Sequence, residues 1–134
     1  MSSVIALDIG GRYIGIAALD HSGKIPYRFK TIDRKQESAL DAIKKICEQE
    51  DVITIVAGVP YHVEDGSETE QTRKTRAFIA ELKSILPEAI DYIEIDETLT
   101  SQEAKRLLGI EGAPAAEEHA EAARILLSEY LAKL

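Results

Sequence analysis

The chain has 134 residues, of which 45% are hydrophobic and 30% charged, and a formal charge of −8. A chain of this length buries about 68% of its unfolded surface, which predicts one domain spanning residues 1–134. No apolar run reaches about 18 residues, so we expect no membrane span. The first residues lack the basic flank of a signal peptide. The single cysteine, Cys47, excludes an internal disulfide and a cysteine cage for zinc. We expect a cytoplasmic protein.

The acidic balance, with 16 basic and 24 acidic side chains, argues against a surface that grips nucleic acid non-specifically. Any contact with nucleic acid would have to come from a local basic patch or through metal ions.

The predicted elements follow the order βββαβαβαα. Apolar runs and turn residues predict strands over residues 4–9, 13–19, 26–32, 53–59 and 90–95. Helical periodicity predicts a helix whose apolar face includes residues 39, 43, 46 and 47, and further helices over residues 67–86, 100–109 and 116–132. Capping pairs are predicted at Asp33 with Gln36, Ser67 with Glu70, and Thr100 with Glu103.

Three sequential strands predict an antiparallel meander, and the two later strands, reached through helices, should lie parallel to a neighbour. The expected fold is α/β: a mixed five-stranded sheet with helices on both faces.

Asp8 is the first candidate for chemistry, because it ends a buried strand and is followed by Gly10 and Gly11. Glycines without Cβ atoms let a phosphate or a metal ion approach the backbone. A strand-ending aspartate with a glycine turn is an equally good interpretation.

Asp96 and Glu97 end the fifth predicted strand. Neighbours in an extended segment point to opposite faces, so one of them can reach the site of Asp8. Glu97 is our choice and Asp96 the reserve; a solvated acidic loop is the competing interpretation.

His119 lies near the N-terminal end of the last predicted helix, and a lone histidine on a mostly apolar face is usually a core or boundary residue. It becomes a candidate site residue only if that helix crosses beside the ends of the first and fifth predicted strands. Arg73 and Arg76 lie in the densest basic group and could meet a phosphate backbone. Salt bridges along a surface helix would explain them equally well.

Together, these motifs resemble the YqgF/RuvX family of Holliday-junction-resolvase-like nucleases, which have a ribonuclease-H-like fold. The resemblance covers nearly the whole chain. It is carried by Leu7-Asp8-Ile9-Gly10, Ile14-Gly15-Ile16-Ala17, Gly58-Val59-Pro60, Asp65-Gly66-Ser67, Arg73 with Arg76-Ala77-Phe78, Asp96-Glu97-Thr98-Leu99-Thr100, and Ala122-Ala123 with Tyr130.

The resemblance implies a metal-dependent nuclease, active in 5′-end processing of pre-16S ribosomal RNA. Mg²⁺ or Mn²⁺ would be held by Asp8, by Glu97 or Asp96, and by the last helix at His119. Gly10, Gly11, Arg73 and Arg76 would bind substrate. The expected substrate is structured RNA, with a DNA junction as the alternative. We expect no membrane partner, and the resemblance leaves open whether the protein forms a homodimer.

The chain departs from the family at two positions. Where the family has aspartate, this chain has His119, which would favour Mn²⁺ over Mg²⁺. Where the family has arginine after Asp-Glu, this chain has Thr98, which removes a phosphate contact.

These departures leave alternatives open: an impaired RNA- or protein-binding module of the same fold, or a Holliday-junction resolvase acting on DNA. An ATP-dependent phosphotransferase half is a weaker alternative, since 134 residues allow only one of the two domains that class needs.

Overall fold

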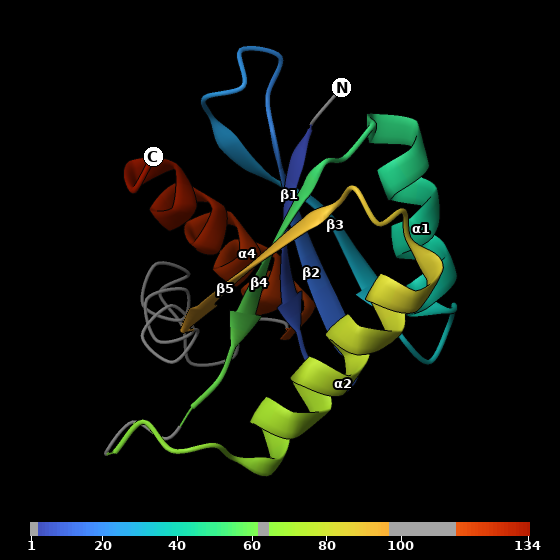
Figure 1. Cartoon of the computed structure of the whole chain (residues 1–134), viewed down its shortest axis with the longest axis vertical. Helices are drawn as coiled ribbons and strands as arrows, with labels where there is room; N and C mark the ends of the chain where they lie inside the picture. The colour runs from blue at the N-terminus through green and yellow to red at the C-terminus, as the bar shows by residue number, and fades with distance from the viewer. Residues whose placement is uncertain (1–2, 62–64, 97–114) are drawn as a thin grey trace.

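The computed structural model describes residues 3–61, 65–96 and 115–134, and the predicted helix over residues 100–109 lies outside them (Figure 1). The elements in chain order are β1 (Val4–Ile9), β2 (Tyr13–Leu19), β3 (Pro26–Asp33), α1 (Ala39–Glu50), β4 (Thr54–Val59), α2 (Glu70–Ile85), β5 (Asp91–Asp96) and α4 (Ala115–Ala132).

One sheet of five strands runs in the order β3-β2-β1-β4-β5. β1 pairs antiparallel with β2, and β2 antiparallel with β3; β1–β4 and β4–β5 are parallel. The predicted mixed sheet is confirmed. Because β1, β4 and β5 are parallel, their carboxyl ends lie at the same edge, which is where a ligand crevice opens in such sheets.

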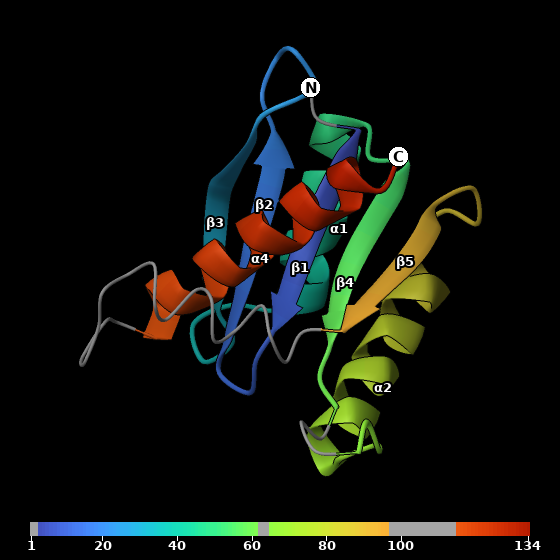
Figure 2. The same ribbon diagram turned by 90° about the vertical axis from the view of Figure 1, so that its left-hand side faces the viewer.

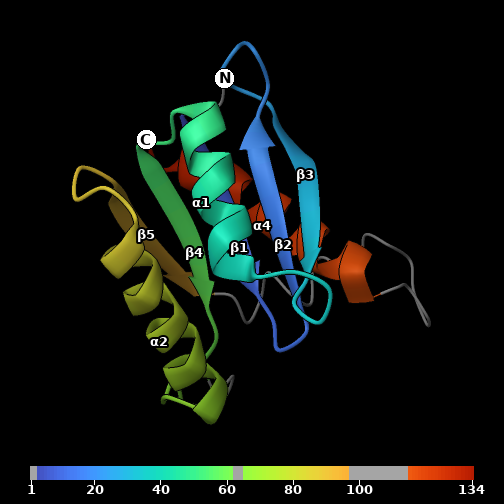
Figure 3. The ribbon, with the colours of Figure 1, turned by 90° about the vertical axis from the view of Figure 1, so that its right-hand side faces the viewer.

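Helices cover both faces of the sheet, as predicted. α1 and α2 lie on one face (Figure 3), and α4 crosses the other (Figure 2). The α1/α2 face is built on large buried side chains such as Ile5, Leu7 and Ile55. The α4 face rests on smaller ones, Ala6 and Ala17, together with Val56.

Two of the predicted capping pairs are wrong. α1 is capped by Ser38, whose hydroxyl accepts from the Asp41 backbone N–H, and Asp33 instead closes a turn with Lys35 and Gln36. α2 is capped two residues later than predicted. There, Thr69 forms the capping box with Thr72, because a threonine hydroxyl satisfies an exposed helix N–H as well as a serine would. The predicted pair Thr100–Glu103 lies outside the described residues.

Within the described part of the chain, no helix is long and apolar enough to cross a membrane.

Candidate functional site

Asp8 is a buried carboxylate at the carboxyl end of β1. Its position pairs with Gly15 of β2, and the residue is only 3% exposed. Burial raises the pKa of the Asp8 carboxyl above its ordinary value, since the charged form loses water. The hydrogen bond from His119 offsets part of this rise. Burying this carboxylate costs solvation free energy, and a buried carboxylate with a shifted pKa is typical of a functional site.

His119 is brought to Asp8 by α4. The Nδ1 of His119 donates a hydrogen bond to Oδ2 of Asp8, across 111 positions of sequence. The helix can come this close because Gly15 has no side chain: a Cβ there would lie 2.0 Å from the carbonyl oxygen of His119 and 2.3 Å from the Ala120 nitrogen. The α4 backbone therefore packs directly against the backbone of β2 at Gly15.

Gly10 provides the second close approach. A Cβ at Gly10 would lie 2.5 Å from Cε1 and 2.8 Å from Nε2 of His119, and 2.7 Å from the Tyr13 carbonyl oxygen. The His119 ring thus lies against the Gly10 backbone. Gly11 has open space where its Cβ would be, so it leaves room for a ligand atom beside the loop.

Two residues that the sequence analysis did not single out hold this loop in place. Arg34 donates from Nη1 to the Gly10 carbonyl oxygen at 2.9 Å, with its guanidinium 5.0 Å from the centre of the Phe78 ring. Gln71 donates to the Ile9 carbonyl oxygen at 3.4 Å. Both come from segments distant in sequence, the β3–α1 connection and the first turn of α2, so no local pattern could have linked them to Asp8.

Asp96 and Asp8 lie on opposite faces of the sheet. Asp8 contacts α4, whereas Glu94 of β5 pairs with Arg76 of α2 at 3.3 Å. Successive strand residues alternate, so Asp96 shares the α2 face with Glu94. Glu97 lies outside the described residues.

Arg73 and Arg76 lie on α2 in different surroundings. Arg76 pairs with Glu68 and Glu94, and its guanidinium lies over the Tyr61 ring. Arg73 is exposed and makes no ion pair with another described residue. Of the two, Arg73 is the cation more readily available to a phosphate.

The donor set for a metal ion is incomplete in the described part of the chain, where no group of three or more His, Cys, Asp or Glu side chains gathers. Asp8 fits a hard divalent ion, since it is a carboxylate that burial leaves poorly solvated. His119 adds a nitrogen donor, which suits Mn²⁺ better than Mg²⁺. Asp8 and His119 thus fit as part of such a site.

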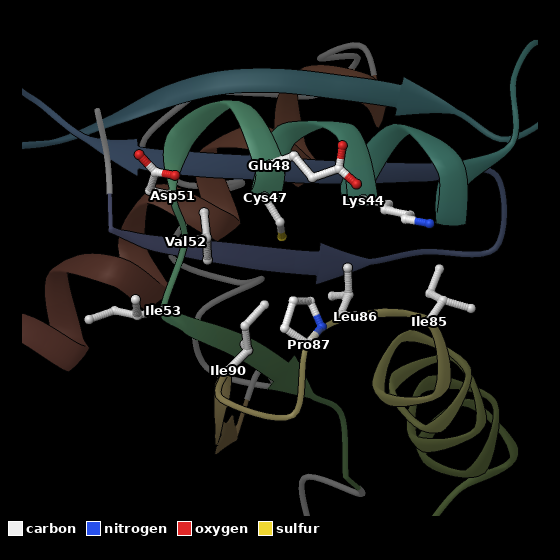
Figure 4. Close-up of a pocket in the computed structure, with 10 residues that line it drawn as sticks. All are labelled: Lys44, Cys47, Glu48, Asp51, Val52, Ile53, Ile85, Leu86, Pro87 and Ile90. Atoms are coloured by element: carbon white, nitrogen blue, oxygen red, sulfur yellow. The ribbon is translucent and has the colours of Figure 1, made fainter.

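A cavity of about 700 Å³ lies at the other end of the sheet (Figure 4). It opens where α1 and α2 end and the chain enters β4 and β5; Ile53, Ile85 and Ile90 are among its lining residues. Burial raises the pKa of the Cys47 thiol there to about 11, so this cysteine is unreactive. None of the described candidate site residues lines this cavity.

Comparison with solved structures defines the fold class. RuvC from Thermus thermophilus in complex with a Holliday junction substrate superposes with a TM-score of 0.58 at 12% identity, covering 97% of this chain and 94% of that one. The fowlpox virus resolvase, in complex with Holliday junction DNA, superposes with a TM-score of 0.50 at 10% identity over 96% and 97%. The fold is that of the ribonuclease-H-like resolvases, as predicted.

The sequence places the chain more narrowly. The family model described as "RuvX: Holliday junction resolvase" matches residues 2–133. A Fusobacterium nucleatum protein named "Putative pre-16S rRNA nuclease" is 37% identical over 81% of this chain and 77% of its own length. A Synechococcus elongatus protein of the same name is 34% identical over 96% and 88%. The chain belongs to the RuvX family, which confirms the resemblance found in the sequence.

Proposed function

We propose that this protein is a metal-dependent nuclease that hydrolyses phosphodiester bonds at the 5′ end of pre-16S ribosomal RNA. The observation that carries the proposal is the contact between Asp8 and His119 at the carboxyl end of β1. It occurs on a resolvase-like fold, in a chain whose relatives bear the name of that nuclease.

Asp8, Glu97 and His119 are the residues that would hold the metal. Divalent ions bound there would make water nucleophilic at neutral pH and stabilise the leaving oxygen. The hydrogen bond from Nδ1 to Asp8 orients the His119 ring and places Nε2 against Gly10. A phosphate entering beside Gly10 and Gly11 would meet no side chain at these two positions, and Arg73 and Arg76 would be the cations for its flanking phosphates.

A DNA junction is the second candidate substrate, favoured by the family description and by the fold of the two resolvases. Hydrolysis of either substrate needs the same chemistry at the Asp8 site. The choice between RNA and DNA therefore depends on the protein surface that binds the rest of the substrate.

The test is cleavage of labelled precursor ribosomal RNA and of a four-way DNA junction, with Mn²⁺ and Mg²⁺ in parallel. Wild type is compared with Asp8→Asn, with His119→Asp, and with Asp91→Asn, a matched change at the opposite end of the sheet. We expect RNA cleavage that is stronger with Mn²⁺, lost in Asp8→Asn and kept in Asp91→Asn.

Two outcomes would overturn parts of the proposal. Cleavage of the junction alone would make the protein a DNA resolvase. No cleavage by wild type or His119→Asp, with all variants folded, would favour the non-catalytic binding module.

A further inference from the structure

Positive charge is concentrated in one segment of this acidic protein. Residues 10–35 carry six basic and two acidic side chains, a formal charge of +4, in a chain whose total is −8. The segment comprises the β1–β2 loop, β2, the β2–β3 turn, β3 and the start of the connection to α1. The segment therefore holds the local excess of cations that nucleic-acid binding would require.

β3, at one edge of the sheet, carries the centre of this segment. Its sequence alternates aromatic and basic residues as Tyr27-Arg28-Phe29-Lys30. The Tyr27 and Phe29 rings lie 6.1 Å apart, and Tyr27 is 40% exposed. Phe29 packs partly against the core, so Tyr27 is the exposed ring of this pair. An exposed ring flanked by cations is typical of surfaces that bind an unpaired strand, because a base stacks on the ring and phosphates meet the cations.

A β-bulge spreads the cations over both sides of this edge. Arg28 pairs with Ala17, which faces α4, and Lys30 pairs with Ile16, which faces α1. In a regular strand, two residues separated by one would share a face. The bulge at Phe29 therefore flanks the edge strand with positive charge on two sides.

Several of these cations have little competition from carboxylates. Lys24, Arg28 and Lys35 make no ion pair with another residue of the described ranges. Arg12 and Lys30 are paired with Asp33 at 3.2 Å and Glu37 at 3.4 Å, in exposed pairs. The Lys30–Glu37 pair is exposed on both sides and therefore weak, so a phosphate can replace this carboxylate readily. Arg12 is held more firmly, because it makes two hydrogen bonds to Asp33.

The segment also leads to the candidate site. Arg34 is bonded to the Gly10 carbonyl oxygen, and the Tyr13 ring lies 6.4 Å from the His119 ring. The eight residues of β3 span roughly 26 Å. A strand of this length can contact about 4 nucleotides, which is the lower end of the site sizes of single-strand binders.

We propose that the β3 edge, from Lys24 to Lys35, binds a single RNA strand and guides it to Asp8. The nature of the nucleic acid rests on the proposed function; the preference for an unpaired strand rests on the exposed Tyr27 ring, which can stack only on an unstacked base.

The experiment measures the affinity of the full chain for a fluorescent single-stranded RNA, by anisotropy in EDTA across a range of salt. A duplex RNA and a single-stranded DNA of the same sequence are run beside it. The edge variant is Lys24→Gln/Arg28→Gln/Lys35→Gln. The matched control removes three cations elsewhere, as Lys44→Gln/Lys45→Gln/Lys133→Gln, and Tyr27→Ala tests stacking. All substituted side chains are exposed, and circular dichroism checks folding.

We expect the edge variant to bind RNA about tenfold or more weakly than the control, with a salt slope smaller by about 2, since each lost phosphate contact on a single strand contributes ~0.7. Tyr27→Ala should lose about fivefold or more. Equal losses in the edge and control variants, or tighter binding of duplex than of single strand, would overturn the proposal. A preference for DNA over RNA would overturn the assignment of the strand as RNA.

Cleavage is assayed separately, so the two proposals fail in different ways. Edge-dependent binding without Asp8-dependent cleavage would support this surface and refute the nuclease. Cleavage with the same KM in wild type and the edge variant would refute the surface and leave the nuclease standing.

Discussion

The two faces of the sheet are built from side chains of different size, and this difference separates stability from function. On the face of α1 and α2, residues such as Ile14, Ile16 and Leu82 fill a broad apolar core. On the other face, Ala17 and Gly15 let α4 approach until its backbone meets β2. Large residues hold helices at a normal distance, whereas small ones let α4 carry His119 to Asp8.

The largest effect should come from filling the close contact under α4. Gly15→Ala would place a Cβ 2.0 Å from the His119 carbonyl oxygen, and backbone cannot move aside as a side chain tip can. We expect about 3 kcal/mol or more of lost stability, at the upper end for overpacking, and loss of nuclease activity. Urea unfolding and cleavage assays measure both. Gly11→Ala is the control, since nothing lies within 4 Å of its Cβ; equal stability of the two variants would disprove the close packing.

Truncating a core leucine on each face should distinguish the faces. Leu82→Ala and Leu127→Ala each remove a fully buried side chain, from α2 and α4 respectively. Each should cost ~2–5 kcal/mol. Only Leu127→Ala loosens the helix that holds His119, so it alone should reduce kcat when measured well below both melting temperatures. A reduced kcat in Leu82→Ala as well would show that the faces are not independent.

Gly10→Ala tests the contact at the ring rather than at the helix backbone. The new Cβ would lie 2.5 Å from Cε1 of His119, whose ring can rotate away, and 2.7 Å from the Tyr13 carbonyl oxygen, which is backbone and has to shift. We expect about 1–3 kcal/mol of lost stability and at least tenfold lower activity, because the ring would leave Asp8. Chemical shifts of the His119 ring protons report the displacement. Unchanged shifts together with unchanged activity would contradict the assigned contact.

The smallest effect concerns the charge of Asp8. Burial raises the pKa of its carboxyl, so the folded protein binds this proton more tightly than the unfolded chain. Stability from this group is then greatest below the ordinary carboxyl pKa and is lost as pH rises through the raised value. Asp8→Asn, which cannot ionise, should melt a few degrees above wild type at pH 7, and the difference should shrink toward pH 4.

Melting temperatures across pH 4–8 measure this effect, with Asp91→Asn as an exposed control. Mn²⁺ at millimolar concentration should raise the melting temperature of wild type more than that of Asp8→Asn. A large drop for Asp8→Asn at pH 7 would mean that the carboxylate stabilises the fold.

Most of the fold could be predicted from local patterns. Each described strand and helix falls within a few residues of its predicted bounds, because apolar periodicity reports directly which side of an element is buried. Both capping errors arose where several hydroxyl and carboxylate residues crowd the start of a helix, as at Ser38 and Thr69. There, the choice of cap depends on backbone geometry that the pattern does not contain.

The candidate site was predictable in part. Asp8 and His119 were each singled out, but their contact spans 111 positions of sequence and depends on where α4 crosses the sheet. Arg34 and Gln71 were not predictable, since each contacts the β1–β2 loop region only through its side chain and from a distant segment. The cations of residues 10–35 are spread over one strand and three connections, and the overall charge of −8 conceals their local excess.

The chain's own pattern of residues sets its elements, the mixed sheet and the family, because these follow from local burial and from short motifs. Three features arise only on folding. Asp8 pairs with His119, Asp96 lies on the opposite face of the sheet from Asp8, and cations lie on both sides of β3. They depend on how closely α4 approaches β2, on which face of β5 packs against α2, and on a single bulge in the pairing of β2 with β3, and each of these is set by contacts between elements rather than within one element.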